Sequence, residues 1–183
     1  MALTKVIGAG IQGLDIASTG VHKLSVPTMF HVTKSQDQSL SDATATVITF
    51  ESVTDDSNGG RTINQGGLYA SNALTATATT AGYYFVYISI FFQAAQNIED
   101  FHMYYRITPS GGDAETHQVV YTNAGQGNNL KYGTIFNHQI LKLDSGDALN
   151  LIGYSNSASS GATNLNQNSV TVQRTNMGGW KIA

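Results

Sequence analysis

The stretch that most constrains the fold is the apolar run over residues 81–93, AGYYFVYISIFFQ. β-Branched and aromatic residues dominate it, which favours a buried β-strand over a helix. Side chains alternate across a strand, so the run has two apolar faces. One face carries Tyr83, Phe85, Tyr87 and Phe91, and the other carries Tyr84, Val86, Ile88, Ile90 and Phe92. Burying five large apolar side chains is worth about 7–15 kcal/mol, comparable to the net stability of a whole domain. We therefore expect both faces to be covered, the second by long loops, another segment or another copy of the chain.

The composition narrows the class of partner. The chain has 183 residues, which suits one domain with a proper core and a short appendage. Charged residues make up 11%, well below the usual share, and the net charge is -3. Nucleic acids and anionic membranes favour clustered Lys and Arg, so we expect neither as a partner. The absence of Cys excludes disulfides and thiolate chemistry.

The N-terminal segment differs from the rest. Residues 1–27 are rich in Gly and Ala, and their scattered apolar residues follow neither a helical nor a strand period. The segment has no signal-peptide pattern, and no apolar run in the chain is long enough to span a bilayer, so we expect synthesis in a cytoplasm without membrane insertion. We predict an irregular attachment segment that docks on a sister chain or a larger assembly. Its candidate anchoring residues are Val6, Ile7, Ile11, Leu14 and Ile16.

The remainder, residues 28–183, is predicted to be a single all-β domain. Turn-rich segments separate short strands, and a helical apolar period is not sustained. The strands are predicted at 29–34, 46–53, 74–79, 81–93, 101–108, 117–122, 132–143, 148–154, 170–174 and 180–182. Residues 155–168 are predicted to form a polar loop. Such an order of elements is typical of a sandwich or jelly roll.

Two motifs carry a resemblance to a known family: 81–85 (AGYYF) and 141–151 (LKLDSGDALNL). With the strand order, they resemble the globular heads of complement component one-q, which share a jelly roll with tumour necrosis factor ligands. The resemblance covers about residues 28–183, and only the ending at 177–182 departs from the family pattern, which leaves the register of the last strand open. It implies a ten-strand jelly-roll sandwich that forms a tight homotrimer, with one sheet of each protomer facing a threefold axis. The residues expected to pack the core or the trimer are Tyr83, Tyr84, Phe85, Val86, Tyr87, Ile88, Ile90, Phe92, Leu141 and Leu143.

A second resemblance concerns the opening residues 1–11, MALTKVIGAGI, which are similar to the N-termini of small fibre and virion proteins of marine tailed phages. Together the two resemblances imply a trimeric, non-enzymatic protein on the virion surface, either a head decoration or a short fibre. Residues 1–27 would then bind other virion structural proteins. The alternative is a receptor-binding tail tip protein that recognises host surface glycans. Aromatic platforms for a glycan are suggested by tyrosines near predicted loops, namely Tyr69, Tyr121, Tyr132 and Tyr154.

The remote alternative is a dinucleotide-binding enzyme, because Gly8–Gly13 forms a GxGxxG pattern. Its context disagrees with such a fold, since Gly20 would interrupt the following helix and the acidic residue that binds ribose is missing at the expected distance. We expect a glycine-rich anchor instead, and no cofactor.

Polar side chains give no clear catalytic or metal motif. The five histidines (His22, His31, His102, His117 and His138) lack HxH and HExxH spacing, although a threefold axis could bring three copies of one together around a metal ion. Carboxylates at Asp55, Asp56, Asp113 and Glu115 are expected in solvated turns, and Asp144 and Asp147 in a structural strand-connecting turn. The chain lacks a GxSxG motif, and no local grouping suggests a Ser-His-Asp triad. We therefore predict neither enzymatic activity nor a dedicated metal site in one chain.

Overall fold

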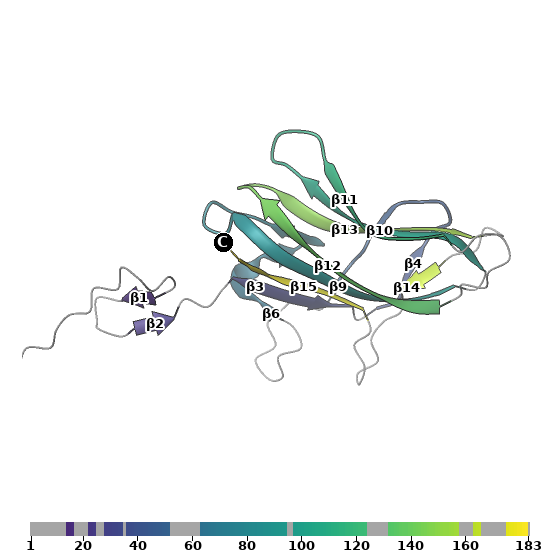
Figure 1. Cartoon of the computed structure of the whole chain (residues 1–183), viewed down its shortest axis with the longest axis horizontal. Coiled ribbons are helices and arrows are strands. Elements are labelled where there is room, and N and C mark those ends of the chain that lie inside the picture. The colour runs from purple at the N-terminus through teal and green to yellow at the C-terminus, as the bar shows by residue number, and fades with distance from the viewer. Residues whose placement is uncertain are drawn as a thin grey trace, which may run out of the picture.

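The computed structural model describes residues 14–16, 22–24, 28–34, 36–51, 63–94, 97–123, 132–157, 163–165 and 175–182. In these residues the chain is a two-layer β-sandwich, and its single helical element is the short 3-10 turn η1 (Gln65–Gly67) (Figure 1). Within the same residues, none of the helical structure is long and apolar enough to cross a bilayer. The predicted all-β jelly-roll class is confirmed.

The first layer is a seven-stranded sheet built around β9 (Gly82–Ala94), the strand formed by the central apolar run. On one side β9 pairs along nearly its whole length with β12 (Tyr132–Leu143). On the other side it pairs with β15 (Asn176–Lys181) and β14 (Thr163–Leu165). The sheet is completed by β3 (Met29–Thr33), β6 (Ile63–Asn64) and β4 (Gln38–Leu40). The pairs named here are antiparallel, which suits a sheet with one packed and one open face.

The second layer is a six-stranded sheet that lies over the first in Figure 1. Its strands run in the order β11 (Glu115–Asn123), β10 (Ile98–Thr108), β13 (Ala148–Ser157), β8 (Ala73–Thr75) and β7 (Tyr69–Ala70), and β5 (Thr46–Val47) also pairs with β13. In the N-terminal segment, β1 (Leu14–Ile16) and β2 (His22–Leu24) form an antiparallel pair of their own. These two short strands lie within the predicted attachment segment.

The hydrophobic core lies between the two layers. The inward face of β9 supplies the side chains from Tyr84 to Phe92, none of them more than 3% exposed. Leu141 and Leu143 of β12 join the same core. The opposite sheet contributes Phe101, whose ring stacks on that of Phe92 with centroids 4.5 Å apart. The alternation along β9 therefore directs one of its two apolar faces into the sandwich, as the sequence predicts.

Several predicted strands need correction. The strand at 132–143 has the predicted bounds, whereas within the described residues 46–51 the strand predicted at 46–53 covers only Thr46–Val47. The predicted loop at 155–168 is wrong, because β13 extends to Ser157 and β14 occupies Thr163–Leu165. The cause is a buried hydrogen bond of 2.6 Å between the hydroxyls of Ser155 and Thr163, which lets polar residues pair inside the sandwich. The expected strand at 170–174 lies outside the described residues, and the final strand is β15.

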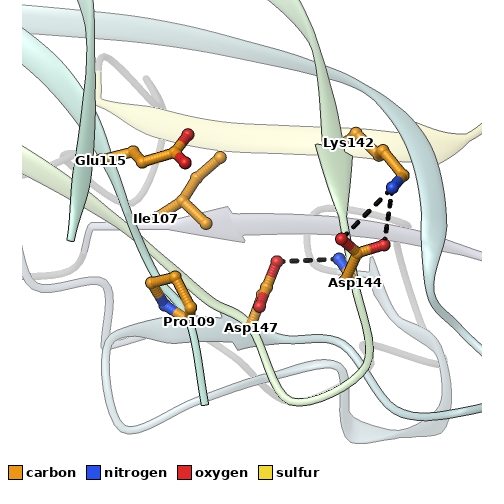
Figure 2. Close-up of a pocket in the computed structure, with 6 residues that line it drawn as sticks. All are labelled: Ile107, Pro109, Glu115, Lys142, Asp144 and Asp147. Atoms are coloured by element: carbon orange, nitrogen blue, oxygen red, sulfur yellow. Dashed lines mark hydrogen bonds and ion pairs between the residues drawn. The ribbon is translucent and has the colours of Figure 1, made fainter. Parts of the chain in front are cut away.

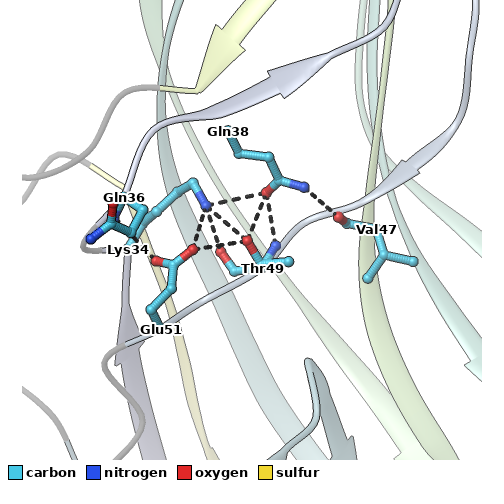
Figure 3. Close-up of polar contacts among 6 residues, drawn as sticks. All are labelled: Lys34, Gln36, Gln38, Val47, Thr49 and Glu51. Carbon is cyan, nitrogen blue, oxygen red and sulfur yellow. Dashed lines mark hydrogen bonds and ion pairs between the residues drawn. The ribbon is translucent and has the colours of Figure 1, made fainter.

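A buried lysine joins the end of β3 to the segment after β5 (Figure 3). The Lys34 side chain is fully buried, and its Nζ donates to Glu51 Oε1 at 3.0 Å, to Gln38 Oε1 at 3.2 Å, and to the carbonyl and hydroxyl oxygens of Thr49 at 2.9 and 3.0 Å. Burial lowers the pKa of Lys34, although the Glu51 carboxylate opposes that effect. A buried charge needs such partners, so these contacts fix the path of residues 34–51 across the sandwich edge.

Candidate functional site

The outer side of the first sheet carries most of the large hydrophobic side chains that remain exposed. We call it the aromatic face, and define it by Tyr83, Phe85, Tyr87, Tyr132, Phe136, His138, Ile140, Trp180 and Ile182. In the described part of the chain, every large exposed hydrophobic residue except Tyr121 belongs to this face. Phe136 and Ile140 of β12 are the clearest cases, with 67% and 64% of their surfaces exposed.

A row of rings runs across three adjacent strands of the aromatic face, β12, β9 and β15. Phe136 and His138 of β12 have centroids 6.4 Å apart, and His138 stacks on Phe85 of β9 at 5.1 Å. Phe85 stacks in turn on Trp180 of β15 at 4.4 Å. Trp180 lies 6.5 Å from the ring of Tyr87. These ring contacts lie within one chain, so part of the apolar surface of the aromatic face is already covered by neighbouring rings.

The row ends in a contact that depends on a glycine. Tyr87 pairs with Gly178 across β9 and β15, and a side-chain carbon at that position would lie 2.4 Å from the Tyr87 hydroxyl oxygen. The tyrosine can therefore lie across β15, and its hydroxyl forms a 2.8 Å hydrogen bond with Nδ1 of His31 on β3. Burial beneath these neighbours raises the pKa of Tyr87. The packing holds the inner half of the row in place and leaves the β12 half open.

The chemistry of the aromatic face suits association better than catalysis. Lys142 sits at its edge and forms a 2.9 Å ion pair with Asp144, so its charge is already matched. The side chains between Phe136 and Trp180 in the row are aromatic rings, which offer contact area and stacking geometry. A contiguous exposed patch of this kind is unusual on a monomeric protein and typically marks an interaction site.

The predicted packing residues separate into two groups. Tyr84, Val86, Ile88, Ile90, Phe92, Leu141 and Leu143 lie in the core, whereas Tyr83, Phe85 and Tyr87 lie on the aromatic face. Sequence reasoning missed Phe136, Ile140 and Trp180, which are 67%, 64% and 42% exposed. The signal was available, because Tyr132, Phe136 and Ile140 share one parity along a strand whose bounds were predicted correctly.

Two of the five candidate anchoring residues belong to the described part of the chain. Leu14 and Ile16 lie in β1, where they pair with Leu24 and His22. Val6, Ile7 and Ile11 lie outside the described residues, as does the Gly8–Gly13 pattern. Asp55 and Asp56 also fall outside them.

The turn that contains Asp144 and Asp147 has a structural role, as predicted. Asp147 Oδ2 accepts a 2.8 Å hydrogen bond from the backbone N–H of Asp144 and so closes the turn between β12 and β13. These residues border a small hollow of about 270 Å³ with Ile107, Glu115 and Lys142 (Figure 2). No group of three or more metal-ligating side chains occurs in the described ranges.

The second sheet carries a separate hollow on its outer side. We call it the β10–β11 groove; it is an open hollow of about 390 Å³, and the described residues that line it are His102, Tyr104, Thr116 and Gln118. The ring of His102 meets Tyr121 of β11 edge-on at 4.5 Å and lies 5.1 Å from Tyr154 of β13.

Two of the four suggested platform tyrosines are thus brought together, on strands rather than loops, at the β10–β11 groove. The other two are not part of it. Tyr69 is wrong as an exposed platform because it is buried in the core, where Phe50 and Phe30 contact its ring. Tyr132 lies on the aromatic face.

Comparison with known proteins shows the fold. No protein-family model matches the chain, and no curated protein matches it in sequence. Among solved structures, murine APRIL is similar with 14% identity and a TM-score of 0.55, over 86% of this chain and 100% of that one. Eiger TNF from S. frugiperda has 15% identity and a TM-score of 0.51, over 86% and 94% of the two chains. The globular domain of zebrafish complement 1qA has 10% identity and a TM-score of 0.53, over 86% and 98%. The chain therefore has the jelly-roll fold of tumour necrosis factor and complement 1q domains.

Proposed function

We propose that this chain is a non-enzymatic structural and binding protein that works as a homotrimer, assembled through its aromatic face. The observation that carries the proposal is the gathering of nearly all large exposed hydrophobic side chains on one sheet. Covering them with copies of the same face removes apolar surface from water, the main driving force of stable association.

The resemblance in fold supports three copies. One-q heads and tumour necrosis factor ligands, which this chain resembles, place the corresponding sheet against a threefold axis. In such an assembly the open β12 half of the row, with Phe136 and Ile140, would pack against the neighbouring protomer. A closed ring of identical contacts leaves no copy of the face uncovered, which suits a soluble particle better than an open chain of contacts.

The test is the solution mass of the full chain in native buffer, with and without a chelator. We expect three times the chain mass of 19.5 kDa in both conditions, because the contacts are apolar. A monomer at micromolar concentration would refute the assembly. A trimer that dissociates on chelation would instead favour a metal ion held by three copies of one histidine.

We propose a tailed-phage virion as the setting, with the protein as a head decoration or short fibre on the virion surface after synthesis in the host cytoplasm. The support is the likeness of residues 1–11 to phage virion proteins, and the separate β1–β2 pair preceding the sandwich. Deleting residues 1–26 should leave a soluble trimer that no longer attaches to particles. Attachment that survives the deletion would argue against anchoring by this segment.

The second candidate function is receptor binding at a tail tip, and the β10–β11 groove favours it. The groove lies on the outer side of the sheet opposite the aromatic face, so self-association would leave it accessible. Free trimer should compete with phage for adsorption to host cells if the protein binds a receptor. A head decoration should not compete.

A further inference from the structure

We propose that the β10–β11 groove is a carbohydrate-binding site, with His102 as its central polar contact. The inference deepens the second candidate function but depends neither on trimer formation nor on a virion setting. Its volume of about 390 Å³ falls in the usual range for small-molecule sites. Four described side chains from two adjacent strands line it, so the site is held by a sheet rather than by a loop.

The lining of the groove has the chemistry that a sugar ring needs. Thr116 supplies a hydroxyl and Gln118 an amide, which together can donate to and accept from ring hydroxyls. Tyr104 adds a ring and a phenolic hydroxyl from the same strand face. A sugar presents apolar C–H faces and a belt of hydroxyls, so aromatic rings beside neutral donors and acceptors complement it.

The observation that points to a ligand is the state of His102. Its Nε2 is shielded from solvent and has no hydrogen-bond partner in the described structure. Leaving such a polar atom unsatisfied is unfavourable. Other buried polar atoms of the described residues, His117 Nε2 among them, also lack a hydrogen-bond partner, but of these residues His102 is the one that lines the groove. A ligand hydroxyl would supply the missing partner.

Access to that nitrogen is controlled by Tyr121. Its ring meets His102 edge-on, yet 53% of the Tyr121 surface is exposed. A ligand can reach the shielded nitrogen only if this ring moves, and rotamer changes of exposed side chains are fast. Tyr154 supports His102 from the opposite side, on β13. His102 is thus placed between two tyrosines of the neighbouring strands β11 and β13.

A basic side chain extends the same row of β10. Arg106 follows His102 and Tyr104 on this face, and its Nε also has no hydrogen-bond partner in the described structure. It lies beside the groove, where a guanidinium can bind a carboxylate. The proposed ligand class is therefore a saccharide, and sugars that carry a carboxylate should bind more tightly than neutral ones.

The experiment uses saturation-transfer NMR on the full chain with two sets of probes. The neutral set contains the methyl glycosides of glucose, galactose, mannose and N-acetylglucosamine, and the acidic set contains methyl glucuronide and methyl sialoside. We expect at least one probe to bind with a dissociation constant below about 10 mM. That value corresponds to a binding free energy of about 3 kcal/mol. Absence of binding by every probe in both sets would overturn the proposal.

The decisive variant is His102→Phe, which keeps a ring of similar shape and removes the unsatisfied nitrogen. If the nitrogen serves a ligand, the variant should lose sugar binding at least fivefold while its melting temperature stays equal or rises, because the buried unsatisfied atom is gone. The matched control is His117→Phe on β11. His117 lies between the groove residues Thr116 and Gln118 and so points to the opposite face of the strand.

The control should bind as tightly as the unchanged protein. Loss of binding in both variants, or a His102→Phe protein that binds normally, would contradict the assignment. Measuring the mass of each protein in the same buffer separates a failed binding site from a failed assembly, because the two sites lie on different sheets.

Discussion

The assembly can be tested most directly by making the open half of the aromatic face polar. We consider the double variant Phe136→Thr and Ile140→Thr on β12. Threonine favours strands and both positions are about two-thirds exposed, so the sandwich should still fold. Fully burying one such side chain is worth about 1.5–3 kcal/mol, so covering the exposed two-thirds contributes about 1–2 kcal/mol. Two positions in three copies then contribute about 6–12 kcal/mol per trimer.

This energy converts into a concentration. At about 1.4 kcal/mol per factor of ten, the trimer dissociation constant should rise about 10⁴- to 10⁹-fold. Because that constant contains the square of a concentration, the concentration at which half of the trimer dissociates should rise about 10²- to 10⁴-fold. Sedimentation velocity from nanomolar to micromolar protein would measure the shift directly.

The control for this variant is Tyr121→Thr, which removes the one large exposed hydrophobic side chain that the described part of the chain places on the other sheet. Its mass should match that of the unchanged protein at every concentration. Near-ultraviolet circular dichroism would establish that both proteins are folded. If the β12 double variant is folded and still trimeric at the same low concentrations, the reasoning from exposed apolar surface is wrong.

Three further predictions concern stability. Glu51→Gln removes the anionic partner of the buried Lys34 ammonium and should lower the unfolding free energy by about 1–3 kcal/mol, measured by urea unfolding. Adding Lys34→Met to this variant should restore part of the lost free energy. A further loss in the double variant would count against the ion pair. Because burial lowers the folded-state pKa of Lys34 below its ordinary 10.5, the unfolded chain binds more protons in that window, and this group makes stability rise as pH increases towards 10.5. Burial raises the pKa of Tyr69 and Tyr105 above the ordinary 10.0, so stability should fall again above about pH 10. A continued rise above that pH would contradict the tyrosine assignment, and a fall on the approach to it would contradict the Lys34 assignment. Gly153→Ala places a carbon 2.9 Å from the end of a neighbouring isoleucine and should cost about 1–3 kcal/mol through overpacking, seen as a lower urea midpoint with an unchanged slope.

The central strand shows what hydrophobic pattern alone can predict. A long run of β-branched and aromatic residues fixes both the element and its burial, and the structure places Tyr84, Val86 and Ile88 in the core with no exposed surface. The hydrophobic pattern could not tell which of the two faces of this strand would turn inward, because both are rich in large apolar side chains. The choice depends on the opposite sheet and on Trp180, which come from distant parts of the chain.

The missed strands show where such prediction stops. β14 carries the sequence Thr-Asn-Leu, which has little apolar signal, and it is buried because Thr163 bonds Ser155 of β13 and because its backbone pairs with β9. Polar residues become interior when another part of the chain satisfies their hydrogen bonds. A single segment contains no information about that partner.

The β10–β11 groove and the aromatic face have a common origin in strand alternation. Phe101, Met103 and Tyr105 of β10 are drawn into the core, so His102 and Tyr104 must face outward. On β12 the same alternation sends Leu141 and Leu143 inward and turns the aromatic residues of the even positions outward. The two outer faces then differ in chemistry: one is apolar and suited to covering by copies of itself, and the other combines rings with neutral polar groups and an unsatisfied nitrogen. A sandwich that associates through the first face leaves the second uncovered by its own copies, and for this reason we propose assembly on one sheet and ligand binding on the other.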